Sequence, residues 1–103
     1  LSMARRNYMI ESDNSLLFLN VRETEGLAIE ALRNHLKSDS SPAVRFAALE
    51  GLLWYFEHLR IPRPTIEGEL QAAKHDSNGK VRLLAEDYLN GLAVSDEKTA
   101  LIQ

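Results

Sequence analysis

The feature that most constrains this fold is a stretch of sequence that occurs twice, 37 residues apart. The string SPAVRFAALEGL, from Ser41 to Leu52, returns as NGKVRLLAEDYL, from Asn78 to Leu89, and an Asp-Ser pair precedes each copy. When residues 37–52 are aligned with residues 74–89, seven of the sixteen pairs are identical: Lys37/Lys74, Asp39/Asp76, Ser40/Ser77, Val44/Val81, Arg45/Arg82, Ala48/Ala85 and Leu52/Leu89. These pairs fall on predicted cap and core positions. A period of this length, with two helices per unit, predicts a stacked array of helix pairs.

The best-defined predicted helix begins inside the first copy of the repeat. Ser41 is a good N-cap because its hydroxyl can accept a hydrogen bond from a free backbone N–H group, and Pro42 suits the first helical turn. Apolar residues then recur at spacings of three and four from Val44 to Leu59, which predicts one broad buried face. We expect this helix to end near Arg60, because the following prolines of the sequence RIPRP cannot continue it.

Three further helices are expected. A capping pair at Asn20 and Glu23 predicts a helix over about residues 21–37, and a shorter helix is expected over about residues 64–75. The second copy of the repeat begins another helix, which Asn78 caps and which Gly91 is expected to stop. The sequence AVSDEKTALIQ, residues 93–103, is then expected to be a loose tail or a short docking segment.

The string D-x-x-x-x-V-R-x-x-A, present in both copies, resembles HEAT repeats. It is similar, more narrowly, to the HEAT-like repeats of phycobilisome-lyase-type proteins. The resemblance covers about residues 21–92 and implies an all-α fold, a short right-handed α-solenoid of two HEAT-like helix pairs at about residues 21–60 and 64–92. It also implies a structural role, bonding across turns and between neighbouring repeats, for Asp39, Arg45, Asp76 and Arg82.

The N-terminal segment, residues 1–20, is the part whose structure the sequence leaves open. It can form a short helix, or a hairpin across residues 12–14, and the helix is favoured because everything downstream is predicted to be helical. Two helix pairs are marginal on their own, since about three are usually needed for stability. We therefore expect this segment to act as a cap or third layer, or two chains to associate through the exposed ends of the stack.

Composition excludes several classes of protein. The chain of 103 residues is one domain at most, and its net charge of −3 gives no general attraction to nucleic acid or to anionic membranes. The absence of cysteine excludes disulfides and zinc–thiolate sites. No apolar run approaches the roughly 18 residues that a membrane span needs. We expect a soluble cytoplasmic protein without a membrane partner.

The sequence contains no recognisable catalytic constellation. His35, His58 and His75 lie on different predicted helices or helix ends, and none has a second ligand at the spacing that a metal site needs. No phosphate-binding glycine loop, nucleophile elbow or dinucleotide fingerprint is present. We therefore predict that the protein is not an enzyme and that it holds no metal or cofactor.

The better candidate for a site is a surface. On a helical wheel, Glu50, Trp54 and Glu57 share one stripe almost opposite the core line, and the 37-residue shift places Asp87 beside Glu50 on the next unit. In HEAT-like stacks the second helix of each pair lines the concave side, so the resemblance puts the stripe there. An indole among carboxylates could bind a basic peptide. Trp54 could equally pack under the N-terminal segment or at a dimer contact.

The favoured function is a non-enzymatic protein–protein interaction module: an adaptor, a scaffold, or an inhibitor of the immunity type. Its expected partner is a protein or a basic peptide. One alternative, implied by the family resemblance alone, is a bilin lyase-type helper in chromophore attachment. The other is a HEAT-like nucleic-acid-binding protein, which the acidic character of the inferred groove disfavours because phosphate contacts would be few.

Overall fold

The computed structural model describes residues 22–102, and the backbone within that range forms helices and no strand. The chain divides into two units, Leu1–Glu30 and Ala31–Gln103. In the first unit residues 22–30 are described, and they are helical. The predictions of a helix or hairpin and of a cap for residues 1–20 lie outside the described residues.

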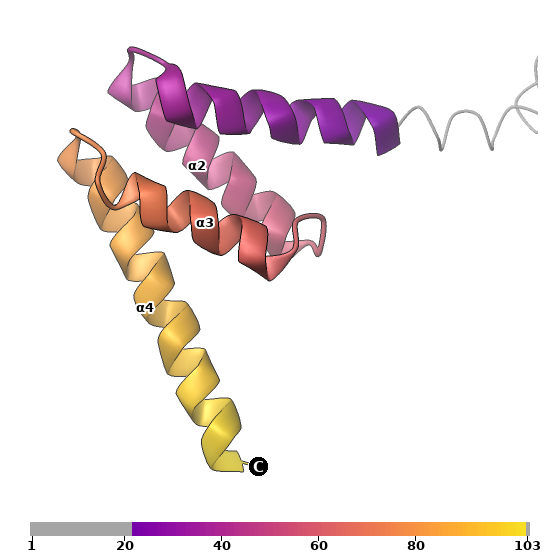
Figure 1. The fold of residues 1–103 in the computed structure, drawn as a ribbon, viewed down its shortest axis with the longest axis vertical. Coiled ribbons are helices and arrows are strands. Elements are labelled where there is room, and N and C mark those ends of the chain that lie inside the picture. Colours follow the sequence, from indigo (N-terminus) through magenta and orange to yellow (C-terminus); the bar gives the residue numbers. More distant parts are fainter. Residues whose placement is uncertain (1–21, 103) are drawn as a thin grey trace, which may run out of the picture. The chain divides into compact units, whose positions relative to one another are not determined.

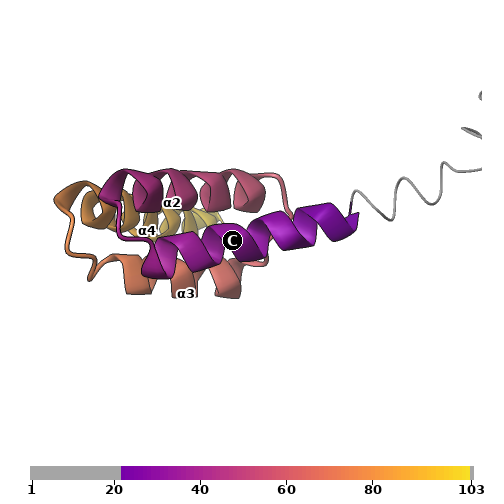
Figure 2. The same cartoon turned by 90° about the horizontal axis from the view of Figure 1, so that it is seen from above.

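The second unit is built from helices joined by short turns (Figure 1). Residues 31–38 are helical, and α2 (Pro42–Glu57), α3 (Arg63–Ala73) and α4 (Gly79–Ile102) follow. Each of α2, α3 and α4 contacts the other two, most extensively α3 with α4. Figure 2 shows α2 and α3 in different layers of this unit. The all-α class expected from the sequence is confirmed for the described residues.

Local hydrogen bonds explain where the two repeated helices begin. The hydroxyl of Ser41 accepts from the backbone N–H of Val44 at 3.3 Å, and Asn78 Oδ1 accepts from the N–H groups of Lys80 and Val81 at 2.9 and 3.3 Å. Both predicted N-caps are therefore confirmed. Two residues before each cap, an aspartate accepts from the N–H of the cap residue at 2.8 Å in both copies. The repeated sequence therefore forms the same turn before both helices.

The core of this unit is made of small and branched apolar side chains. Its most deeply buried members are Leu49, Leu52, Ile66, Leu70, Val81 and Ala85, all with exposed fractions of 0%. Gly51 allows α2 to approach residue 32 closely, because a Cβ atom at Gly51 would lie 3.0 Å from Leu32 Cδ1. Burial of an aliphatic side chain of this size contributes roughly 1.5–3 kcal/mol, so these residues supply the main driving force for folding.

Two positions assigned to the buried face of α2 are exposed. Val44 is 39% exposed although its repeat partner Val81 is fully buried. Leu59 lies beyond the end of α2 and is 89% exposed. The prediction failed for Leu59 because α2 ends at Glu57, so the helical spacing on which it relied no longer applies at residue 59.

The predicted helix stop at Gly91 is also wrong. Helix α4 continues through Gly91 to Ile102, so residues 93–102 form helical turns rather than a loose tail. A glycine inside a helix costs only about 1 kcal/mol relative to alanine, and no proline follows it. The guanidinium of Arg63, in the first turn of α3, also donates to both carboxylate oxygens of Asp96 at 2.8 and 2.6 Å, which ties this extension to α3.

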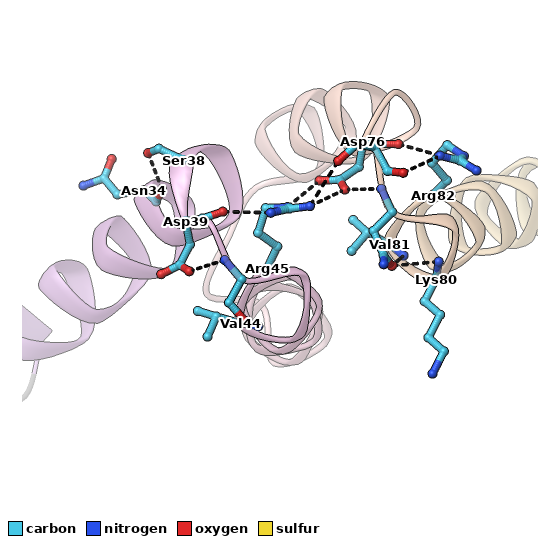
Figure 3. Close-up of polar contacts among 12 residues, drawn as sticks. Asn34, Ser38, Asp39, Val44, Arg45, Asp76, Lys80, Val81 and Arg82 are labelled. Carbon is cyan, nitrogen blue, oxygen red and sulfur yellow. Dashed lines mark hydrogen bonds and ion pairs between the residues drawn. The ribbon is translucent and has the colours of Figure 1, made fainter.

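One arginine links the two copies of the repeat (Figure 3). Arg45 Nη1 donates to the backbone carbonyl of Asp39 at 2.8 Å, while its Nε and Nη2 donate to the two carboxylate oxygens of Asp76 at 2.9 and 3.0 Å. Only 12% of the Arg45 side chain and 10% of the Asp76 side chain are exposed. Arg82 repeats the first contact, since its Nη1 donates to the carbonyl of Asp76 at 2.8 Å. The first turn of α2 is thereby fixed to the turn that precedes α4.

The Arg45 contact predicts a pH-dependent contribution to stability. The hydrogen bonds from Arg45 lower the pKa of Asp76, with a further contribution from the N–H of Asn78. A carboxyl group with a depressed pKa stabilises the folded state above its unfolded pKa of about 3.9, and this contribution is lost as the pH falls through the folded pKa. We expect Asp76→Asn to lower the free energy of unfolding by about 1–2 kcal/mol at neutral pH. The loss should shrink in acid.

Urea unfolding measured across the acidic range checks this expectation. The matched control is Asp39→Asn in the first copy of the turn, because the Asp39 carboxylate faces the ring of His35 at 2.9 Å instead of an arginine. The control should cost less than Asp76→Asn. Equal losses for the two variants would show that the contact with Arg45 contributes nothing beyond the turn itself.

Tyr88 also joins α2 to α4, and its burial and contacts raise the pKa of its hydroxyl group. The hydroxyl of Tyr88 donates to Glu57 Oε2 at 2.7 Å, and the Tyr88 ring meets that of Phe56 edge to face at 6.2 Å. Burial, and then the bond to Glu57, raise the pKa of Tyr88 to about 12. Because the neutral phenol is the favoured form, this group stabilises the fold below about pH 10, and the contribution is lost as the pH rises towards 12.

We expect a spectrophotometric titration to resolve this tyrosine. The difference between the wild-type protein and Tyr88→Phe should show one phenol that ionises near pH 12. Glu57→Gln should lower that midpoint only in part, since burial is the larger cause of the shift. A difference curve centred on the ordinary value of about 10 would contradict the buried, hydrogen-bonded placement of Tyr88.

Candidate functional site

Trp54 is the most prominent side chain on the outward face of α2. It is 52% exposed, although it lies between the buried pair Leu52 and Leu53 and the half-buried Tyr55. The ring of His58 stacks on the indole, with centroids 3.9 Å apart and planes inclined by 21°, and Tyr55 meets the indole edge-on at 5.2 Å. His58 Nδ1 also lies 2.8 Å from the carbonyl oxygen of Trp54. The indole is therefore held in one orientation while half of its surface faces solvent.

Two carboxylates lie on the same helix as this indole, and a third lies on α4. Glu50 and Glu57 are both exposed and lie one helical turn before and after Trp54. Asp87 is exposed on α4, one residue before Tyr88, whose hydroxyl binds Glu57. We call Glu50, Trp54, Glu57 and Asp87 the Trp54 surface. Its two glutamates share one face of α2 with the indole, and the bond from Tyr88 to Glu57 connects this helix to the one that carries Asp87.

The chemistry that such a surface offers is binding. An exposed indole attracts a cation to its π face, and neighbouring carboxylates add charge complementarity for the same cation. Among the residues that the structure describes, no group of three or more histidine, aspartate or glutamate side chains could hold a metal ion. No helix in the described range has both the length and the apolar character needed to cross a membrane.

A cavity elsewhere in this unit is another candidate. It measures about 430 Å³ and is lined by Leu36 and Lys37 from the helix before α2 and by residues of α3 and the following turn. Two carboxylates on its wall are already paired. Glu69 accepts from Arg33 at 2.9 Å, and Asp76 binds Arg45. These carboxylates therefore stabilise the packing of the helices, and the cavity is a weaker candidate than the Trp54 surface.

The sequence missed three residues of this region. His58 enters the sequence prediction only as a rejected metal ligand, although its position four residues after Trp54 is the spacing at which helical side chains meet. Tyr88 gave no signal, because its contact with Glu57 depends on how α2 and α4 pack. Leu59 was assigned to the core through its apolar character. A proline-rich sequence directly after it was the available sign that the helix ends early.

The structural residues expected from the repeat lie apart from this surface. Asp39, Arg45, Asp76 and Arg82 gather at the turns that precede α2 and α4, where their bonds run between turns (Figure 3). Comparison of the chain with protein-family models, with curated proteins and with solved structures gives no match.

Proposed function

We propose that this chain is a protein-binding module, without catalytic activity, whose Trp54 surface takes a basic peptide segment of a partner protein. The observation that carries the proposal is the half-exposed, stacked indole of Trp54 on a helix that buries Leu49 and Leu52 completely on its other side. A large aromatic side chain left in contact with water gains nothing for folding from its exposed half. Trp is also among the residues that most often dominate binding energy at interfaces.

Charge favours a basic partner over an acidic one. Glu50 and Glu57 share the exposed face of α2 with the indole, and Asp87 is a third exposed carboxylate on α4; negative charge of this kind attracts lysine and arginine and repels phosphate. An arginine side chain can stack its guanidinium on an indole and direct its N–H donors to carboxylates, so one residue type satisfies both features of the surface. A nucleic acid would instead bring its phosphates against these three acidic groups.

A short HEAT-like stack, with α2 and α4 as the second helices of its two pairs, is the architecture that we propose for this surface. The sequence repeat supports it, as does the bidentate contact of Arg45 with Asp76 in the next copy. In such a stack, second helices lie side by side and present one continuous face. Residues on α2 and α4 that are 37 positions apart, such as Glu50 and Asp87, would then be neighbours on it.

The outer face of α4 indicates how such a stack would end. At the two positions where α2 carries the buried residues Leu49 and Leu53, α4 carries the exposed residues Glu86 and Asn90. Polar replacement of core leucines is the usual property of a capping repeat, which must face water on one side. This pattern favours a stack closed by its own polar side chains over one closed by a second chain.

A direct measurement of peptide binding tests the proposed function. Fluorescence anisotropy of a labelled Arg-Gly-Arg-Ala-Arg-Gly peptide should show saturable binding at low salt, and its aspartate counterpart should not bind. Trp54→Ala should weaken binding roughly two- to thirtyfold, the range expected for loss of a cation–π contact of about 0.5–2 kcal/mol. Glu50→Lys should weaken binding as well, because it reverses a charge beside the indole.

Two control variants separate the Trp54 surface from general effects of hydrophobicity and charge. Leu83→Ala removes a different exposed apolar side chain, which lies on α4 and is 57% exposed. Glu97→Lys reverses a charge near the end of α4. Both should bind the peptide like the wild-type protein. The proposal is wrong if the arginine peptide does not bind, or if the controls weaken it as much as Trp54→Ala does.

The proposed cap can be tested separately. The double variant Glu86→Leu/Asn90→Leu restores the two leucines of the first copy to the outer face of α4. We expect this variant to self-associate at concentrations where the wild-type protein remains monomeric, because a new apolar patch needs cover. Light scattering coupled to size-exclusion chromatography reads this out, with Glu86→Gln as the control. A wild-type protein that is already dimeric through this face would contradict the capping role.

A further inference from the structure

Leu59 adopts a backbone conformation that leucine disfavours. Its φ is 61°, and it is the one non-glycine residue with positive φ in the described part of the chain. The turn is a Schellman motif, because the N–H of Leu59 donates to the carbonyl of Phe56 at 3.0 Å and that of Arg60 to the carbonyl of Tyr55 at 2.8 Å. Glycine is the usual residue at this position, since a Cβ atom crowds the following carbonyl oxygen.

The side chain of Leu59 gains nothing from packing that would offset this strain. It is 89% exposed, whereas Ile61, two residues further on, is 5% exposed and belongs to the core. The turn therefore has a buried apolar side chain to anchor it, and that side chain is not Leu59. Neither backbone preference nor burial within this unit accounts for a leucine here, and strained residues of this kind cluster at binding sites.

The residues near Leu59 indicate a role for its side chain in binding. It directly follows His58, the residue that stacks on Trp54, so the last turn of α2 and the residues just after it carry two large exposed apolar side chains, Trp54 and Leu59. Glu50 and Glu57 lie on the exposed face of the same helix. A partner segment that is basic and also carries a large apolar side chain would match both the charge and the exposed hydrophobic area.

We propose that Leu59 is an apolar anchor that extends the Trp54 surface and selects a basic segment carrying a large aliphatic or aromatic side chain close to its arginines. This inference rests on the proposed function and names the class of segment. The strained turn holds the leucine away from the core, where it can contact the partner. Leucine at residue 59 thus makes the turn less stable than glycine would, and it contributes to binding instead.

Two peptides and one substitution test the anchor. The peptides are Arg-Gly-Arg-Leu-Arg-Gly and Arg-Gly-Arg-Ala-Arg-Gly, which differ only in the apolar side chain. The wild-type protein should bind the leucine peptide more tightly, by up to about tenfold. Leu59→Gly should abolish that gain, so that the two peptides bind this variant with about equal affinity. Trp54→Ala should weaken the binding of both peptides.

Thermal unfolding of the same variants tests the strain. Leu59→Gly should raise the melting temperature, by roughly 2–8 °C, because glycine accepts the left-handed conformation. Leu59→Asn, which also tolerates that conformation but is polar, should leave the melting temperature unchanged or higher and should lose the gain for the leucine peptide. The second variant shows whether the lost gain reflects the apolar side chain or the flexibility of glycine.

The possible outcomes separate this inference from the proposed function. If neither peptide binds the wild-type protein, the proposed function fails and the anchor fails with it. If both peptides bind but Leu59→Gly keeps the preference for leucine, the Trp54 surface stands and the anchor is overturned. A fall in the melting temperature of both Leu59→Gly and Leu59→Asn would show that the leucine stabilises the turn, which would also overturn the anchor.

Discussion

The contact between Arg45 and Asp76 is the interaction on which the rest of the described arrangement depends. It is a bidentate, charge-assisted pair in which both side chains are nearly buried, and such pairs fix geometry as well as distance. The same guanidinium also holds the backbone carbonyl of Asp39, so a single side chain connects both copies of the repeated turn. Because these turns begin α2 and α4, the pair fixes the first turn of α2 to the turn that starts α4. Tyr88 can then reach Glu57.

Helix α2 divides the work of folding and binding between its two faces. One side of α2 buries Leu49, Leu52 and Leu53, so the core does not require the side chain of Trp54. The indole is nevertheless not loose, because His58 stacks on it. A binding residue that is rigid before the partner arrives loses less conformational entropy on binding. The structure thus combines an exposed aromatic side chain with a fixed orientation.

Sequence reasoning succeeded where structure follows from local chemistry and failed where it follows from packing. The caps at Ser41 and Asn78 were predictable because a side chain there bonds to the backbone two or three residues away. The exposed stripe around Trp54 was predictable from helical periodicity. Periodicity could not show that α2 ends before Leu59, because a left-handed residue closes that helix. It also could not show the ion pair between Arg63 and Asp96, residues 33 positions apart, that accompanies the continuation of α4 through Gly91. The HEAT-like architecture remains a prediction.

The length of α4 makes its last turns less stable than the rest of this unit. Its 24 residues span about 36 Å, and residues 93–101 are all exposed. The ion pair that ties this extension to α3, Arg63 with Asp96, has 40% and 56% of its side chains in contact with solvent. Exposed pairs weaken as ionic strength rises, whereas burial of leucine does not. Fraying of the last turns of α4 should therefore increase with ionic strength. Amide hydrogen exchange in these turns should become faster at high salt, while the leucine core stays protected.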